Sequence, residues 1–378
     1  MNNSTFNPYK PQEKGRISIL QLVFMNITLV IATADVFLPA FVAQEAQQDS
    51  WISVILGTIA SLVFVNMFLT LGLKYPDKTL IQYSCDILGK PLGKLVGLLY
   101  IYYFLFIAWV VTRELGEIFV TAFNPSAPVL VFSITVVIVA AYAVLSGLEV
   151  IARINEILIP SGMGVLLFIA LINAPNMDFK NFFPIMYNGF YPPVKGAILI
   201  QAWQMETVIL LQVIPFVKEK DKIRKGISAS IIILGLSLEV GALTIATFGS
   251  LTAKMLFPAL EYVRIASLGP YIQNLDISIM IVWIAGIFIK IAITYYTSVL
   301  SISQYLGLKS YKQVIIPVGV LIICFSMATA KMLVDFIHSL HYIFPFLSFT
   351  MGVVIPGILL LVSVVRSKLA GSGKTLKG

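Results

Sequence analysis

The chain has 378 residues, 58% of them hydrophobic and 12% charged, and its mean hydropathy is +0.93. These values exclude a soluble domain and indicate an all-α integral membrane protein with many spans. The net charge of +8 comes mostly from basic residues in alternating loops, so it reports topology and gives no reason to expect a nucleic-acid partner. Cys85 and Cys324 fall on different elements, which predicts neither a disulfide nor a metal site.

Hydrophobic runs recur along the whole chain, and each is long enough to cross a bilayer as a helix of about 20 residues. The connections are too short to fold separately, so we expect a single membrane domain over residues 17–365, with cytoplasmic tails at 1–16 and 366–378. The first run is too long for a signal-peptide core and is expected to remain uncleaved. The ten predicted spans cover 17–43, 51–73, 94–122, 129–147, 153–173, 196–217, 226–250, 276–305, 312–330 and 341–365.

Lysine and arginine are shared unequally between the two sides of these spans. With the N-terminus inside, nineteen of the 26 fall in inner segments and five in outer segments, while Arg113 and Lys290 lie within spans. Because basic residues concentrate on the cytoplasmic side of membrane proteins, both termini are predicted to be cytoplasmic.

Five spans in each half is an odd number, so a duplicated unit must insert the second time upside down. The predicted repeats cover about 17–173 and 196–365, an inverted arrangement from which alternating-access transporters are built. In such folds the first and sixth spans are interrupted near the midplane. The first span reads IATADVFLPAF, with a charged Asp35 before Pro39, and we expect it to be broken there. A continuous helix kinked at Pro39 is the alternative.

The sixth span, GAILIQAWQMETVILLQVIPFV, carries Glu206 near its middle. A carboxylate at that depth is costly unless it is paired, hydrated or protonated, so it is the first functional candidate. Gln204 and Trp203 precede it and Pro215 follows, which predicts a discontinuous helix that lines a midplane pocket. A structural acid held in a salt bridge is the alternative.

Two further ionisable residues fall at a similar depth, Glu239 in the seventh span and Lys290 in the eighth. Lys290 therefore has two candidate carboxylate partners, and the sequence does not choose between them. Together with Glu206 they form a candidate proton or ion relay, because the charge of a buried lysine depends on its surroundings. A purely structural Lys–Glu pair remains the alternative.

Other motifs are interpreted as structural. Arg113 and Glu117 are spaced for an (i, i+4) salt bridge near the outer face, and glycines at every fourth residue around Gly93 predict close helix packing. The stretch KYPDKTLIQYSCDILGKPLGK predicts a short amphipathic helix on the cytoplasmic surface. His338 and His341, in the last outer loop, are interpreted as solvated residues. No hydrolase, phosphate-binding or metalloprotease motif is present, so we expect neither an enzyme nor a cofactor.

Several stretches together resemble the B subunits of bacterial spore germinant receptors, a group within the amino acid–polyamine–organocation transporter superfamily. These stretches are TRELGEIF at 112–119, GLEVIARINEILIP at 147–160, NFFPIMYNGFYPPVKGA at 181–197, QMETVILLQVIPFV at 204–217 and FPALEYVRIASLGPYIQNLDISIMIVWIAGIFIKI at 257–291. The resemblance implies a ten-helix inverted-repeat fold in the spore inner membrane. It also implies a sensor of small nutrients (germinants) that works with an A-type membrane subunit and a C-type lipoprotein.

The same resemblance implies a midplane ligand pocket. Its residues would be Thr33, Ala34 and Asp35 on the first span, Tyr103 and Ile107 on the third, Trp203, Gln204 and Glu206 on the sixth, and Ile289 and Lys290 on the eighth.

This chain departs from the family pattern because Ala32, Ala34, Gln204 and Met205 stand where glycines are usual. Their side chains narrow the space beside an unwound backbone. The alternatives to binding an amino acid as a standard permease would are therefore a different ligand, or a path for water or ions. Three functions fit the sequence: a germinant sensor, a proton- or sodium-coupled amino-acid transporter, and a ligand-gated ion or water pathway.

Overall fold

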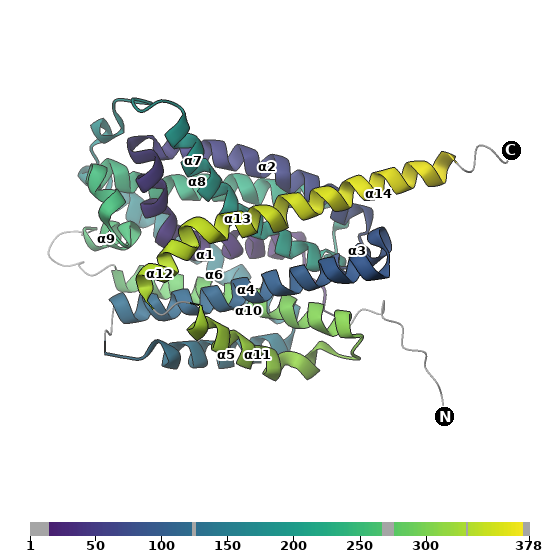
Figure 1. The fold of residues 1–378 in the computed structure, drawn as a ribbon. Coiled ribbons are helices and arrows are strands. Elements are labelled where there is room, and N and C mark those ends of the chain that lie inside the picture. The colour runs from purple at the N-terminus through teal and green to yellow at the C-terminus, as the bar shows by residue number, and fades with distance from the viewer. Residues whose placement is uncertain (1–14, 123–125, 267–275, 330–331, 373–378) are drawn as a thin grey trace.

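The computed structural model describes residues 15–122, 126–266, 276–329 and 332–372, which form a bundle of helices with no strand among them (Figure 1). Most of the two predicted tails, 1–14 and 373–378, lies outside the described residues. Nine stretches of the described residues are long and apolar enough to span a membrane. The first has 56 residues, which as one straight helix would measure about 84 Å, so it must cross twice. The ten predicted crossings are therefore present.

The first half of the chain supplies five crossings and one short surface helix. Its helices are α1 (Ile19–Ala46), α2 (Ser50–Lys74), α3 (Leu80–Leu88), α4 (Lys90–Ala122), α5 (Val129–Ser146) and α6 (Leu148–Ile172). The short helix α3 corresponds to the amphipathic segment expected from the sequence, and it buries one face against α4.

Helix α1 is the central element of the bundle. It begins with a capping box in which Ser18 accepts from the backbone of Gln21, and it packs against α6, α7, α8 and α10. The predicted interruption near Asp35 is wrong, because α1 is one continuous helix that includes Pro39. The residues before Asp35 are Ala32, Thr33 and Ala34, which do not favour unwinding as glycines would, and a proline costs a membrane helix little when neighbouring groups compensate for the lost hydrogen bond.

The sixth crossing does change its backbone near the predicted position. Helix α7 (Tyr191–Gln204) ends two residues before Glu206, and the chain continues as the 3₁₀ helix η4 (Met205–Gln212) and the short turn η5 (Ile214–Phe216). A 3₁₀ helix is wound more tightly than an α-helix and long runs of it are uncommon. The discontinuity is thus a change of helix type and not an unwound gap.

The remaining crossings follow in chain order, and the last of them contains two π-helical turns. The elements are α8 (Ile223–Phe248), α9 (Pro258–Arg264), α10 (Asp276–Leu306), α11 (Ile315–Ala328), α12 (Leu333–His338), α13 (Phe344–Phe349) and α14 (Ile355–Ser372), with π turns at Ser339–Ile343 and Thr350–Val354.

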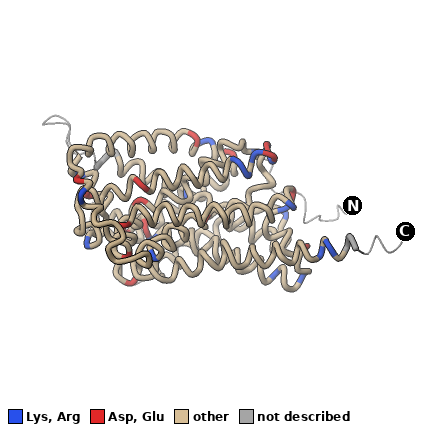
Figure 2. Tube along the Cα trace, turned by 90° about the horizontal axis from the view of Figure 1, so that it is seen from above, with Lys and Arg blue, Asp and Glu red and all other residues tan. Residues whose placement is uncertain are grey.

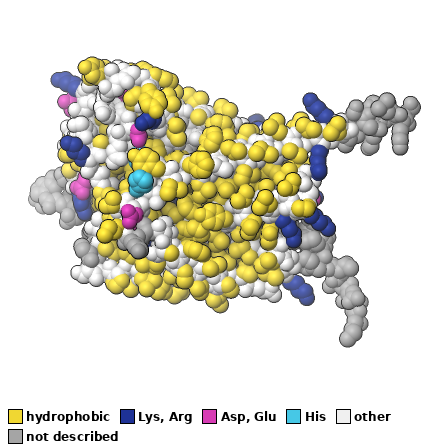
Figure 3. Space-filling view, viewed as in Figure 1, with side chains coloured by type: hydrophobic (Ala, Val, Ile, Leu, Met, Phe, Trp, Pro, Cys, Tyr) yellow, Lys and Arg dark blue, Asp and Glu magenta, His cyan; other side chains and the backbone are white. Residues whose placement is uncertain are grey.

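The surface is organised for a bilayer. Figure 3 shows apolar side chains covering the middle of the bundle and charged side chains near its two ends. Figure 2 shows many of the Lys and Arg residues at the end where α14 projects. That end also carries α3, since Arg366 donates to the Asp86 carbonyl and Lys74 donates to Ser363. The described part of the chain is therefore an integral membrane protein.

The glycine spacing noted in the sequence marks a close contact between α3 and α4. A Cβ atom on Gly93 would collide with the backbone Cα of Cys85, and also lie 2.7 Å from the Ser84 carbonyl oxygen. Backbone atoms cannot rotate away as a side chain can. Gly164 on α6 provides a contrast, because a Cβ there would meet nothing within 4 Å.

We expect Gly93→Ala to lower the free energy of unfolding by about 1–3 kcal/mol, because the added methyl group overpacks the α3–α4 contact. Gly164→Ala is the matched control, and it should be neutral or stabilising by up to about 1 kcal/mol because alanine is the better helix former. Thermal unfolding of the purified variants in one detergent gives both values. Equal stability of the two variants would contradict the close contact.

Candidate functional site

Three polar side chains from three different elements meet inside the bundle. The Lys290 ammonium group on α10 lies 2.7 Å from Glu206 Oε2 and donates to Glu206 Oε1 at 3.0 Å. The same group donates to Thr33 Oγ1 on α1 at 2.7 Å. Lys290 is 0% exposed and the Glu206 side chain 2% exposed. A buried charge is tolerated only with such partners, so we name Thr33, Glu206 and Lys290 the central cluster.

Local sequence explains why these three residues meet. Glu206 lies at the first turn of η4, where the sixth crossing changes from α to 3₁₀ geometry. Gly286 lies one turn before Lys290 on α10, and a Cβ on it would be only 3.5 Å from Ala32 Cβ. These small residues let α10 approach α1 closely enough for the Lys290 side chain to reach Thr33.

The third ionisable residue of the predicted relay lies elsewhere. Glu239 on α8 is half-buried and forms no hydrogen bond or ion pair with the described residues. Of the two carboxylates that the sequence offered to Lys290, the structure pairs it with Glu206.

Sequence reasoning missed a second acid beside the central cluster. Glu114 on α4 is buried, its Oε2 atom has no hydrogen-bond partner among the described residues, and it lies within electrostatic reach of Lys290 and Glu206. Its neighbours Arg113 and Glu117 form the expected (i, i+4) salt bridge, at 2.5 Å and buried. Glu114 follows Tyr103 by eleven residues, which is close to three full helical turns, so the two share a face. That spacing was the available signal.

Helix α4 supplies one wall beside the cluster. The Tyr103 hydroxyl shares a 3.0 Å hydrogen bond with Ser348 on α13 and lies within electrostatic reach of Glu206. Ile107, one turn further along, is fully buried. Ala34 on α1 and Ile289 on α10 are also fully buried and contribute only apolar surface.

The other predicted pocket residues point away from the central cluster. Trp203 packs between Phe41 and Phe344, with ring centroids 6.1 and 4.6 Å away. Gln204 donates to Thr58 on α2 at 3.2 Å. Asp35 forms no hydrogen bond or ion pair with the described residues and lines a separate cavity.

Contacts at both ends tie α1 to its surroundings. At the end carrying α3, the Ile17 amide donates to the Phe216 carbonyl at 3.0 Å, and the Ile19 amide donates to Glu219 at 3.0 Å. At the opposite end, Glu45 lies 3.1 Å from His341 and 3.4 Å from Lys195. The interpretation of His341 as a solvated residue is therefore wrong, because its ring is largely buried and also packs on Phe41.

Among the residues that the structure describes, no three His, Cys, Asp or Glu side chains are grouped to hold a metal ion. The two cysteines stay apart and free, Cys85 on α3 and Cys324 on α11.

Comparison with known proteins places the chain in a family. The family model described as "Spore germination protein" matches residues 16–334. The chain belongs to the spore germination protein family. Relatives of this spore germination protein include Spore germination protein KB of Bacillus subtilis (strain 168), 28% identical over 329 residues that cover 84% of this chain and 86% of the relative. Spore germination protein XB of Bacillus anthracis is 26% identical over 357 residues, covering 91% and 98%. The resemblance drawn from the sequence is thereby confirmed.

Solved structures show which fold this spore germination protein has. The structure of MhsT in complex with L-phenylalanine aligns with a TM-score of 0.69 at 15% identity, covering 92% of this chain and 89% of MhsT. Mhp1, a nucleobase-cation-symport-1 family transporter, aligns with a TM-score of 0.60 at 12% identity, covering 95% and 80%. These likenesses confirm the ten-helix fold built from two inverted repeats.

We expect Lys290→Met to lower the free energy of unfolding by about 3–5 kcal/mol, because Glu206 would be left buried without its cation. The double variant Lys290→Met with Glu206→Gln should recover most of that loss, since no unpaired charge remains. Thermal unfolding of the three proteins in the same detergent measures the effect.

The exposed pair Arg264–Glu261 supplies the control. Arg264→Met should cost less than about 1 kcal/mol, because solvent screens that pair. A double variant as unstable as Lys290→Met alone would show that the loss does not come from an unpaired charge.

Proposed function

We propose that this chain is the nutrient-sensing membrane subunit, of the B type, in a spore germination receptor. The observation that carries the proposal is the central cluster, which joins α1, the 3₁₀ part of the sixth crossing and α10 through one buried ion pair. Family membership supports the link to germination. In this proposal the membrane domain spans 17–365 and lies in the spore inner membrane, as family membership suggests. Both tails are cytoplasmic, as the distribution of basic residues predicts.

The proposed signal begins with competition for the ion pair. A small polar nutrient that binds beside Tyr103 and Ile107, between α1, α4, the sixth crossing and α10, would offer its own charge to Lys290 or Glu206. Because the bundle depends on that pair, binding would favour a different arrangement of its helices. Partner subunits of the A and C types would respond to that rearrangement. The fold shared with MhsT, whose structure contains L-phenylalanine, supports amino acids as one ligand class.

Coupled transport is the second candidate function. It is favoured by the fold shared with Mhp1, which is a transporter, and by the buried charges of the central cluster. A sensor needs only to bind its ligand, whereas a carrier must release it on the other side of the membrane.

We expect one class of nutrient among L-amino acids, nucleosides and sugars to raise the unfolding temperature of the purified wild-type protein. A ligand at 100 times its Kd adds about 2.7 kcal/mol of stability when it binds only the folded state. Glu206→Gln should abolish this stabilisation and the germination response of spores that carry the variant. Glu239→Gln, which alters a half-buried acid outside the central cluster, should preserve both. A wild-type response from Glu206→Gln spores would overturn the proposal.

Proteoliposomes separate sensing from transport. We expect the stabilising nutrient, radiolabelled, to bind without accumulating in vesicles under an imposed proton or sodium gradient. Accumulation that depends on the gradient and disappears in Glu206→Gln would favour the transporter.

A further inference from the structure

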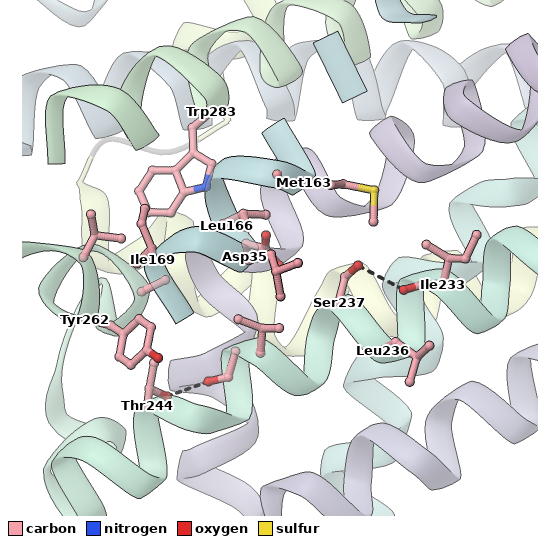
Figure 4. Close-up of a pocket in the computed structure, with 16 residues that line it drawn as sticks. Asp35, Met163, Leu166, Ile169, Ile233, Leu236, Ser237, Thr244, Tyr262 and Trp283 are labelled. Carbon is pink, nitrogen blue, oxygen red and sulfur yellow. Dashed lines mark hydrogen bonds between the residues drawn. The ribbon is translucent and has the colours of Figure 1, made fainter. Parts of the chain in front are cut away.

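A cavity lies on the side of α1 away from the central cluster. It has a volume of about 380 Å³ and lies between α6, α8, α9 and α10, with α1 at its floor (Figure 4). Most of the lining is apolar, as with Met163, Leu166 and Ile169. Leu167 and Leu236 also line it and are 59% and 67% exposed, so it opens onto the lipid-facing surface. We call it the lateral cavity.

Three buried side chains of the lateral cavity, those of Asp35, Tyr262 and Trp283, carry a polar atom with no hydrogen-bond partner among the described residues. Asp35 is 7% exposed, and it forms no hydrogen bond or ion pair with the described residues. Trp283 is 4% exposed, and its indole nitrogen has no acceptor among the described residues. Both line the cavity in Figure 4. Buried polar groups are nearly always satisfied, so an acceptor and a donor left open in one cavity indicate a missing ligand.

The neighbouring hydroxyl groups do not serve Asp35. Ser237 donates to the Ile233 carbonyl at 3.0 Å, and Thr244 donates to the Gly241 carbonyl at 2.7 Å. Pro39 has no N–H to donate to the Asp35 carbonyl, so the backbone there also lacks its usual helical donor. Since the Tyr262 hydroxyl also has no partner among the described residues, none of these hydroxyl groups donates to Asp35.

The central cluster cannot supply the missing cation. Asp35 follows Thr33 by two residues, which turns its side chain by about 200° around α1. Lys290 is held by Thr33 and Glu206 on the other side. The lining of the lateral cavity contains no Lys, Arg or His. A hard metal ion is a poor fit, because such cations take about six oxygen ligands and Asp35 is the only carboxylate in a mostly apolar lining.

We propose that the lateral cavity binds a small organic amine whose apolar body carries one acceptor oxygen. The ammonium group pairs with Asp35, the oxygen accepts from the Trp283 indole N–H, and the apolar body fills the space between α6 and α8. A zwitterionic amino acid fits less well, because the lining offers no cation to its carboxylate. This site does not depend on the proposed function at the central cluster.

A free amine suits the site better than a phospholipid headgroup. Asp35 lies eleven residues before the end of α1 at Ala46, which places it about 16 Å along the helix from that end. An aminophospholipid would have to draw its headgroup that far into the hydrocarbon region. A small amine can reach Asp35 through the opening between α6 and α8.

The test uses the full chain in phosphatidylcholine nanodiscs, with radiolabelled tyramine as the probe. Tyramine has an ammonium group, an aromatic body and a phenolic oxygen. We expect saturable binding, with tyrosol, its neutral alcohol counterpart, and tyrosine, its zwitterionic counterpart, each at least tenfold weaker. Asp35→Asn should weaken tyramine binding at least tenfold.

Trp283→Phe separates the two polar contacts. It should weaken tyramine binding about threefold to tenfold and leave phenethylamine, which lacks the oxygen, unchanged, since the ring is kept and only the N–H is lost. A merely structural role of Trp283 would weaken both amines equally, and that result would overturn its assignment as a ligand contact.

Two further variants keep the test decisive. Gly164→Leu adds a side chain at the cavity wall, where a Cβ would meet nothing within 4 Å, so it should abolish tyramine binding even if Asp35→Asn fails to fold. Glu206→Gln should retain tyramine binding within twofold, which separates this site from the central cluster. Equal binding of tyrosol and tyramine, an unchanged Kd in folded Asp35→Asn, or displacement of tyramine by phosphatidylethanolamine would overturn the proposal.

Discussion

Holding a lysine in the middle of a membrane bundle requires a carboxylate within reach, and in this protein that requirement fixes three helices relative to one another. Lys290 on α10, Glu206 on η4 and Thr33 on α1 satisfy each other at 2.7 to 3.0 Å. Removing any one of them would leave a polar group in a place without water. The packing of α1 against both halves of the chain is thus tied to one ion pair.

The polar groups around the Lys290–Glu206 ion pair differ between the α4 side and the far side of α1. On the α4 side, Tyr103 and Glu114 add further polar groups close to Lys290 and Glu206. On the far side of α1, Asp35 faces an apolar cavity without a counter-charge. One helix therefore presents a satisfied polar face to one part of the bundle and an unsatisfied acid to another.

Much of the architecture could be read from the sequence, because hydrophobic length and the distribution of basic residues depend on the bilayer and not on tertiary packing. Counting along the spans also placed Glu206 and Lys290 at one depth. Depth says nothing about rotation around a helix axis. For that reason the sequence could not choose between Glu206 and Glu239 as the partner of Lys290, and it grouped Asp35 with Thr33 although the two face opposite sides. The continuity of α1 also depends on neighbours that only the folded bundle supplies.

The 3₁₀ helix after Gln204 gives the molecule a built-in change of length. Its eight residues rise about 2.0 Å each, whereas an α-helix would rise 1.5 Å, so rewinding them would shorten this segment by about 4 Å. It would also turn Glu206 relative to the segment that follows. That segment ends at Phe216, whose carbonyl accepts a hydrogen bond from the backbone N–H of Ile17, just ahead of α1. Conversion of η4 from 3₁₀ to α geometry would therefore displace the N-terminal end of α1 through this hydrogen bond.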